Sequence, residues 1–397
     1  MNLVSTLSSL SSGAAFAAIK GSASALRVCL EIPEGDRFNS REQRSRKVIA
    51  ETTDPEMVEL STPNTTLSGS ECEMTCDRWL HHRLLNSSPS GIIQKQTLRS
   101  QSQDASARAT NQHQLIVNAD DFGASEEVNE AIIRAYKEGV LTSASLMVTG
   151  DAFEQAVRLA KENPGLAVGI HLVTVVGRSQ LPQSAIPSLV DEDRNFSNDP
   201  TAAGLKYFFS IRARHELRKE LAAQFEKFHS TGLPLSHIDG HLHLHVHPVI
   251  FNTALELGAK YGARRMRVPE EERRLALKFD PQNALGKTIH TVLFGGLARY
   301  MKRKLRARGF TFPERVYGNL QSGRMNERYF LYALDNLRAE TNEIYFHPAL
   351  YAEGRSLSAD EQQCFIEFEA LTSARVKQRL NESNVKLTNY FEMEASR

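Results

Sequence analysis

Residues 114–139, "QLIVNADDFGASEEVNEAIIRAYKEG", predict one strand followed by one helix, and this pair decides the class of fold. The apolar run 115–117 suits a buried strand. Ser125 can cap a helix that Gly139 ends, and the two Glu residues after Ser125 lie where the helix dipole favours acids. One face of this helix is apolar and consists of Val128, Ala131, Ile132 and Ala135.

The strand–helix order recurs along the rest of the chain. Further strands are expected in "SASLMVTG" (143–150), "LAVGIHL" (166–172), "SHIDGHLHLHVHP" (236–248), "RRMRVP" (264–269) and "NEIYFHP" (342–348). Helices are expected over residues 152–163, 213–230, 248–262, 284–309, 326–340 and 359–382. Residues 174–212 contain three Pro and predict an irregular insertion or lid. The alternation indicates an α/β fold with parallel strands, either a (β/α) barrel or an open doubly wound sheet.

Composition divides the chain near residue 112. Residues 1–112 hold eighteen Ser and the remaining 285 residues hold sixteen, so we interpret 1–112 as a largely disordered leader and 113–397 as the folded domain. The balance of 48 basic and 47 acidic residues argues against a nucleic-acid partner. Four Cys and the absence of an apolar run of 18 residues predict a cytoplasmic protein without a disulfide framework or a membrane-spanning helix.

Acidic and imidazole side chains fall at the ends of four expected strands. They are Asp120 and Asp121 after the first strand, His171 in the third, the His-rich tract 236–248 and His347 in the last. Taken singly, the Asp pair could be a helix cap beside a loop carboxylate, and His171 could be a core residue. Because parallel strands end at one rim, however, we expect these groups to converge.

The His-rich tract places His237, Asp239 and His241 on one face of its strand, since strand side chains alternate. A polar strand face is costly unless its groups are paired or bind an ion. One carboxylate and two imidazoles form a common divalent-metal set, and a second carboxylate suits a general base. The tract continues with His243, His245 and His247, which we expect to line the rim, orient ligands or face solvent.

Three of these stretches, "LIVNADDFG", "GIHL" and "SHIDGHLHLHVHP", resemble the motifs of the YdjC-type carbohydrate deacetylases. The resemblance covers roughly residues 113–350 and is greatest to the hopanoid-biosynthesis-associated branch called HpnK. It implies a (β/α) barrel-like fold of the polysaccharide-deacetylase type. It also implies removal of an acetyl group from an N-acetylated sugar with one divalent metal ion.

The resemblance assigns roles to individual residues. Asp120 corresponds to the proton-accepting base, and Asp121, His171 and His241 correspond to the metal ligands. His347, in "FHP", corresponds to a late His that protonates the leaving amine. The products would be acetate and a free amino sugar.

Two more residues and the metal complete the expected site. His237 and Asp239 would lie beside the metal and fix the orientation of its imidazoles. The imidazole-rich ligand set favours Zn²⁺, whereas the resemblance implies Mg²⁺, so both are kept.

Residues 291–310, "TVLFGGLARYMKRKLRARGF", combine a stripe of Leu293, Leu297, Met301 and Leu305 with six cations and no acid. Such a helix suits an anionic membrane surface or an outer helix with a solvated basic face. With the resemblance to a hopanoid-pathway branch, the segment predicts peripheral membrane contact and a lipid-linked acetylated sugar as substrate.

Other functions remain open at this stage. The first is a deacetylase of soluble chito-oligosaccharides. The second is a non-haem Fe(II) oxygenase, which also uses two His and one carboxylate. The third is a non-enzymatic protein that binds several metal ions through the His-rich tract. A homodimer is also open.

Overall fold

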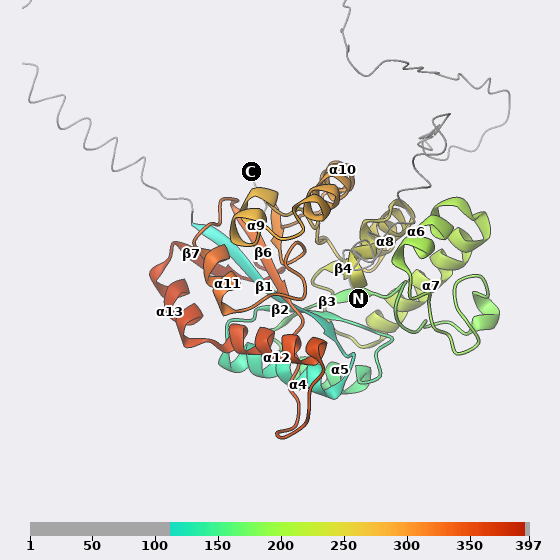
Figure 1. Cartoon of the computed structure of the whole chain (residues 1–397). Coiled ribbons are helices and arrows are strands. Elements are labelled where there is room, and N and C mark those ends of the chain that lie inside the picture. The colour runs from blue at the N-terminus through green and yellow to red at the C-terminus, as the bar shows by residue number, and fades with distance from the viewer. Residues whose placement is uncertain (1–111, 394–397) are drawn as a thin grey trace, which may run out of the picture. The chain divides into compact units, whose positions relative to one another are not determined.

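The computed structural model describes residues 112–393, and within them seven parallel strands form one sheet (Figure 1). The strands run in the order β4–β3–β2–β1–β6–β5, and β7 pairs with the first half of β1. Their bounds are β1 (His113–Phe122), β2 (Ser143–Leu146), β3 (Ala167–Leu172), β4 (Ile238–Gly240), β5 (Arg315–Tyr317), β6 (Thr341–Phe346) and β7 (Val385–Thr388).

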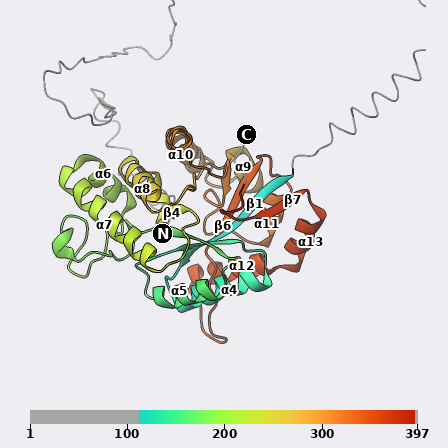
Figure 2. The same ribbon diagram turned by 180° about the vertical axis from the view of Figure 1, so that it is seen from behind.

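Helices cover the outside of this sheet. They are α4 (Glu126–Glu138), α5 (Phe153–Glu162), α6 (Pro200–Phe209), α7 (Ile211–Ser230), α8 (Pro248–Lys260), α9 (Arg273–Phe279), α10 (Ala284–Ala307), α11 (Glu327–Leu334), α12 (Ala359–Thr372) and α13 (Ala374–Glu382), with the short 3₁₀ helices η1 (Gln183–Ala185) and η2 (His241–Val246). Helices α4, α5 and α12 lie along one side, while α6, α7 and α8 flank the β3–β4 edge (Figures 1 and 2).

The sheet curls toward a barrel, and residues 264–270 join its two edges. On one side Arg267 N donates to Ile238 O of β4 at 3.0 Å. On the other side Val316 N of β5 donates to Glu270 O at 3.1 Å. The segment predicted as a strand in "RRMRVP" therefore makes only isolated bridges, but it occupies the place that closes the barrel-like fold. The expected (β/α) barrel-like architecture is confirmed.

The opening strand–helix pair forms as its sequence predicts. The run 115–117 in β1 is fully buried between neighbouring strands on both edges. Ser125 caps α4, its hydroxyl accepting a hydrogen bond from Val128 N at 3.3 Å, and Gly139 follows the last turn. Burial of both faces of the strand explains why the apolar run is continuous rather than alternating, since Leu115 and Val117 join one core cluster and Ile116 joins another.

Three expectations about elements were wrong. Residues 174–212 are not irregular throughout, because α6 forms after Asp199, whose side chain caps it. The expected helix 359–382 is two helices, which break at Ser373. The strand in the His-rich tract was expected to end near His243 and ends earlier, at Gly240, because Leu242 and His243 adopt left-handed backbone conformations with φ of 51° and 56°. The tract therefore turns into η2 instead of continuing along the sheet.

Most of the apolar stripe in residues 291–310, which suited either a membrane surface or an outer helix, packs on the core. Met301 and Leu305 are fully buried, and Leu297 packs against the same core. Of the four stripe residues only Leu293 is exposed. No helix within residues 112–393 has both the length and the apolar sequence needed to cross a bilayer. The Ser-rich leader expected over residues 1–112 lies outside the described residues except for Gln112.

Candidate metal centre

The adjacent carboxylates at the end of β1 point to different partners. Asp121 has a φ of 64°, and the pairing of β1 with β2 is irregular between Ala119 and Phe122. This irregularity turns Asp120 inward, where it is 2% exposed, and turns Asp121 toward the rim. The strand thus runs through both Asp residues to Phe122, although a loop was expected from Asp120 onward.

Asp121, His171 and His241 come together at this rim. Asp121 Oδ1 lies 3.3 Å from His171 Nε2 and 3.1 Å from His241 Nδ1. One ligand atom from each of the three residues lies within 4.8 Å of the others. Burial acts to raise the pKa of Asp121, but the two imidazoles lower it well below its usual range. An ionised carboxylate and two imidazoles at this spacing fit a single divalent cation.

Asp239 orients one of the two imidazoles. His171 Nδ1 is 2.8 Å from Asp239 Oδ1, so Nδ1–H donates there and Nε2 is the ring atom left to bind a cation beside Asp121. Asp239 is itself held by the Ser145 hydroxyl, which donates to its Oδ2 at 2.7 Å. Asp239 thus contacts one of the expected ligands directly, and its role in orienting that ligand stays a prediction.

His237 lies deeper than expected. Its Nδ1 contacts Ser236 Oγ at 2.7 Å, its Nε2 contacts Ser145 Oγ at 3.1 Å, and its Nε2 is 3.7 Å from Asp239 Oδ2. His237 therefore contacts Ser145 and Asp239, which lie between it and the three candidate metal ligands. Its ring also explains Gly169, because a Cβ at that position would lie 2.4 Å from His237 Cε1.

A second group of potential ligands, Asp120, His171 and Asp239, is also close together. Its carboxylates, however, are already paired with Arg267. Arg267 Nη1 and Nη2 donate to the two oxygens of Asp120, each at 2.8 Å, and Nη1 lies 3.0 Å from Asp239 Oδ2. A guanidinium in this place repels a cation, so the metal centre is the outer group.

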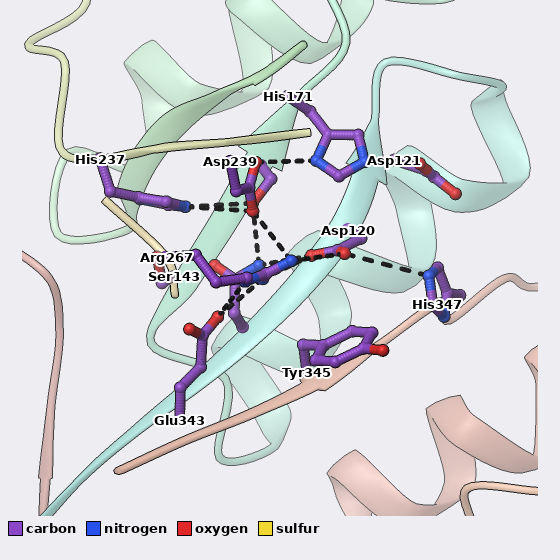
Figure 3. A network of polar contacts seen from close by, with 12 residues as sticks. Asp120, Asp121, Ser143, His171, His237, Asp239, Arg267, Glu343, Tyr345 and His347 are labelled. Carbon is purple, nitrogen blue, oxygen red and sulfur yellow. Dashed lines mark hydrogen bonds and ion pairs between the residues drawn. The ribbon is translucent and has the colours of Figure 1, made fainter. Parts of the chain in front are cut away.

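Arg267 is the main functional residue that the sequence did not reveal (Figure 3). It is fully buried, and its Nε and Nη2 donate to Glu343 Oε1 at 2.9 and 2.6 Å. Its guanidinium also lies 4.8 Å from the centre of the Tyr345 ring. Burial acts to lower the pKa of Arg267, but Asp120, Asp239 and Glu343 raise it well above its usual value.

Tyr390, in the C-terminal segment, contacts the buried ion pairs of Arg267 on the side of Glu343. The Tyr390 hydroxyl donates to Glu343 Oε2 at 2.5 Å, and its ring stacks on His237 with centroids 3.8 Å apart. One signal in the sequence could have found Arg267 and Glu343. Arg267 is a lone charged residue between apolar neighbours in "MRV", and Glu343 is the lone charged residue of the strand-like run "NEIYF".

His347 lies at the end of β6, on the other side of Asp120 (Figure 3). Its Nε2 is 4.0 Å from Asp120 Oδ2, and its Nδ1 is 3.8 Å from Glu367 Oε2. Burial acts to lower the pKa of His347, but Glu367 and then Asp121 and Asp120 raise it to about 9. The side chain remains one-third exposed, so it can reach a ligand at the rim.

The remaining His residues of the tract do not join the metal centre. His243 Nε2 lies 2.9 Å from the Tyr345 hydroxyl, and His245 Nε2 lies 3.1 Å from the backbone oxygen of Arg267. Both are buried, and burial holds the pKa of His245 at about 4. Through these contacts they pack against Tyr345 and Arg267, beside the buried ion pairs that Arg267 makes with Asp120, Asp239 and Glu343.

A cavity of about 290 Å³ opens beside the metal centre. Asp121 and His241 form part of its lining, along with residues of the loops after β2 and β3. A second hollow of about 350 Å³ shares Thr149, Gly150, Asp151 and Arg178 with it. Each is close to the smallest volume, roughly 300 Å³, of ordinary small-molecule sites. The two hollows adjoin each other through these four shared residues.

We expect the purified protein to bind one divalent ion per chain and His241→Ala to lose it, because this change removes one of only three ligands. Elemental analysis after dialysis against Zn²⁺ or Mg²⁺ measures the metal content. His247→Ala is the control, since His247 packs on Phe208 outside the centre. Several ions per chain, or equal losses in the two variants, would instead support metal binding by the His-rich tract as a whole.

Comparison with known proteins shows relatives that match most of the described residues. The family model described as YdjC-like protein matches residues 114–382. A carbohydrate deacetylase of Clostridium beijerinckii is 33% identical over 70% of this chain and 98% of its own length. A carbohydrate deacetylase of Brevibacillus brevis is 48% identical, but the match spans 37% of this chain and 56% of that relative.

A more distant relative and a solved structure match over similar lengths. A chitooligosaccharide deacetylase of Proteus mirabilis is 29% identical over 70% of this chain and 98% of its own length. Among solved structures, a proposed cellobiose-phosphate cleavage protein of Enterococcus faecalis superposes with a TM-score of 0.51 and 26% identity. That match covers 71% of this chain and 99% of the other.

Proposed function

The chain belongs to the YdjC-like family, and from this membership and the geometry of its centre we propose that it is a metal-dependent hydrolase that deacetylates an N-acetylated sugar. One observation carries the proposal. A buried carboxylate, Asp120, and a partly exposed imidazole, His347, both lie beside the Asp121–His171–His241 group, and their side chains approach to 4.0 Å. Amide hydrolysis needs these three parts, namely a site for a cation, a base and an acid.

Asp120 is the base in this proposal. A divalent cation held by Asp121, His171 and His241 would supply Lewis-acid chemistry and a more acidic water. Arg267 binds both oxygens of Asp120 and fixes the plane of the carboxylate. Each carboxylate oxygen has two lone pairs, so Oδ2 keeps one to accept the proton of the attacking water. Water adds its oxygen to the acetyl carbon.

His347 completes the reaction as the acid. Its imidazolium gives a proton to the sugar nitrogen while the bond between that nitrogen and the acetyl carbon breaks. The products are acetate and a free amine. Glu367, at 3.8 Å from His347 Nδ1, favours the protonated ring before each turnover.

The pKa of His347 predicts how the rate depends on pH. Because the acid must be protonated, kcat should fall as the pH rises through the pKa of His347, which is about 9 without metal and lower beside a bound cation. His347→Gln should remove this high-pH limb and lower kcat by roughly 10²-fold at neutral pH. A pH profile of kcat for both proteins tests this. An unchanged limb in the variant would assign the acid to another group.

The identity of the metal is part of the proposal. Two imidazoles favour Zn²⁺ or another transition metal on grounds of ligand softness, and Mg²⁺ is the other candidate. A non-haem Fe(II) oxygenase would use a similar ligand set, but such sites are usual on antiparallel barrels, whereas this sheet is parallel. Acetate release without oxygen uptake would support the hydrolase, and oxygen uptake would support the oxygenase.

For the substrate we propose the acetylated sugar headgroup of a hopanoid glycolipid, reached by a cytoplasmic enzyme at the membrane surface, as a monomer or homodimer. The resemblance of the sequence to the hopanoid-associated branch supports this choice. The alternative is a soluble chito-oligosaccharide. The second hollow, which adjoins the cavity at the metal centre, and the chitooligosaccharide deacetylase among the relatives favour that alternative.

An acetate-release assay tests both the reaction and the substrate. The metal-loaded protein is offered N,N'-diacetylchitobiose and an N-acetylglucosaminyl lipid in detergent at equal concentration. A higher kcat/KM on the lipid supports the hopanoid proposal, and a higher value on the disaccharide supports the alternative. No acetate from either substrate contradicts the proposed reaction.

A further inference from the structure

Two groups of large apolar side chains are exposed on neighbouring helices. The first group, around the junction of α6 and α7, is Leu205, Phe208, Phe209 and Ile211. The second group, in the first half of α10, is Leu285, Ile289, Val292 and Leu293. Phe209 is 73% exposed, and Ile211 is 82% exposed. The described residues expose eleven large apolar side chains in all, and eight belong to these two groups, so the exposure is concentrated rather than scattered.

The two groups lie on either side of α8. Helices α6 and α10 each contact α8 and η2, the turn that carries the metal ligand His241. Figures 1 and 2 show α6, α8 and α10 in a row along one side of the domain. The ring of Phe208 lies 6.1 Å from that of His247, which links the first group directly to the His-rich tract. We call the two groups together the α6–α10 surface.

Cations border both apolar groups. Around the first group, Lys206, Arg212, Arg218 and Lys219 are exposed. Glu216 is the one acid between residues 200 and 219, and it is buried and paired with Arg212 at 2.8 Å. On α10, the helical spacing that joins Leu285 to Val292 continues to Arg299 and Arg303, both exposed, and no acid occurs from residue 284 to 308.

The charges decide which partner fits the α6–α10 surface. A second copy of the chain, related by twofold symmetry, would place these cations against their own counterparts. An anionic bilayer instead offers a negative headgroup layer to the cations and an acyl layer to Phe209, Ile211 and Val292. We propose that the α6–α10 surface binds the anionic surface of a lipid bilayer. This inference does not depend on the proposed deacetylation.

Vesicle flotation with the full-length chain tests this inference. The vesicles are phosphatidylcholine alone or phosphatidylcholine with about one part in three of phosphatidylglycerol. The wild type should bind the anionic vesicles and lose binding as salt is raised. The pairs Phe209→Ser with Ile211→Ser and Val292→Ser with Leu293→Ser should each lower the partition coefficient at least about tenfold.

Matched controls separate this surface from general hydrophobicity. Ile366→Ser and Phe391→Ser alter side chains that are 39% and 38% exposed outside the two groups, and they should bind as the wild type does. Equal binding by the wild type and the two double variants would overturn the proposal, as would no binding by the wild type. A dimer that the double variants convert to monomer, with vesicle binding unchanged, would also overturn it and assign the surface to a second copy.

The deacetylase activity is measured separately in the same variants. Acetate release from soluble N,N'-diacetylchitobiose should be unchanged in both double variants, because the α6–α10 substitutions do not touch the metal centre. Failure of the wild type to release acetate, together with normal vesicle binding, would remove the proposed reaction and leave the bilayer proposal standing. Normal acetate release without vesicle binding would remove the bilayer proposal and leave the proposed deacetylation standing.

Discussion

Asp120→Asn is expected to lower kcat by about 10²–10⁴-fold while the metal content stays at one ion per chain. The amide has nearly the shape of the carboxylate but cannot accept the proton of the attacking water. Asp120 lies within the buried network, and both its oxygens bind Arg267, so the ligand atoms of the metal centre are left in place. Steady-state kinetics and elemental analysis on the same preparation measure the two quantities.

Asp121→Asn is the matched control for this prediction, because the two residues are adjacent in sequence and carry the same group. Asp121 faces His171 and His241 at 3.3 and 3.1 Å, so its variant should lose the metal as well as the activity. The division of roles is wrong if Asp120→Asn releases the metal and Asp121→Asn retains it. A surface variant, Asp193→Asn, should change neither quantity.

The sequence predicted that the groups of the candidate metal centre converge, because the parallel sheet gathers the ends of its strands at one rim. Asp121, His171 and His241 are separated by up to 120 residues, yet their ligand atoms lie within 4.8 Å. The expected convergence rests on the common direction of the strands, whereas the choice of these three residues as ligands rests on the resemblance to the YdjC-type deacetylases. The same rule could not assign His237, because its position depends on the contacts of its ring with Ser145 and Tyr390.

Arg267 could not be predicted in the same way, because its position depends on how the barrel closes. Residues 264–270 join β4 to β5 through a few isolated bonds, and no periodic pattern of side chains marks such a segment. The role of the helix that carries residues 291–310 could not be decided from its sequence for a related reason. Its apolar stripe is equally suited to a core and to a membrane, and only the packing of Met301 and Leu305 decides between them.

Arg267→Met is expected to lower the free energy of unfolding by about 3–5 kcal/mol, because it leaves buried carboxylates without their cation. The side chain of Met fills much of the same volume, so the loss is electrostatic rather than a cavity. Three acids, Asp120, Asp239 and Glu343, share the one guanidinium, and all are buried. Urea denaturation at neutral pH measures the change. Activity should fall as well, since Asp120 would no longer be held in one plane.

Arg264→Met is the control for Arg267→Met, because it removes an exposed Arg three residues earlier in the same segment and should lower the free energy of unfolding by less than about 1 kcal/mol.

The pH dependence of this stability difference gives a further check. Burial acts to raise the pKa of Asp239, but Arg267 and His171 hold it well below the usual 3.8. The stability that this pairing contributes is therefore complete above about pH 4 and is lost as the pH falls through the folded pKa. The difference in the free energy of unfolding between the wild type and Arg267→Met should therefore become smaller in acid. If this difference is small at pH 7, or becomes larger below pH 4, then Arg267 does not stabilise the buried carboxylates.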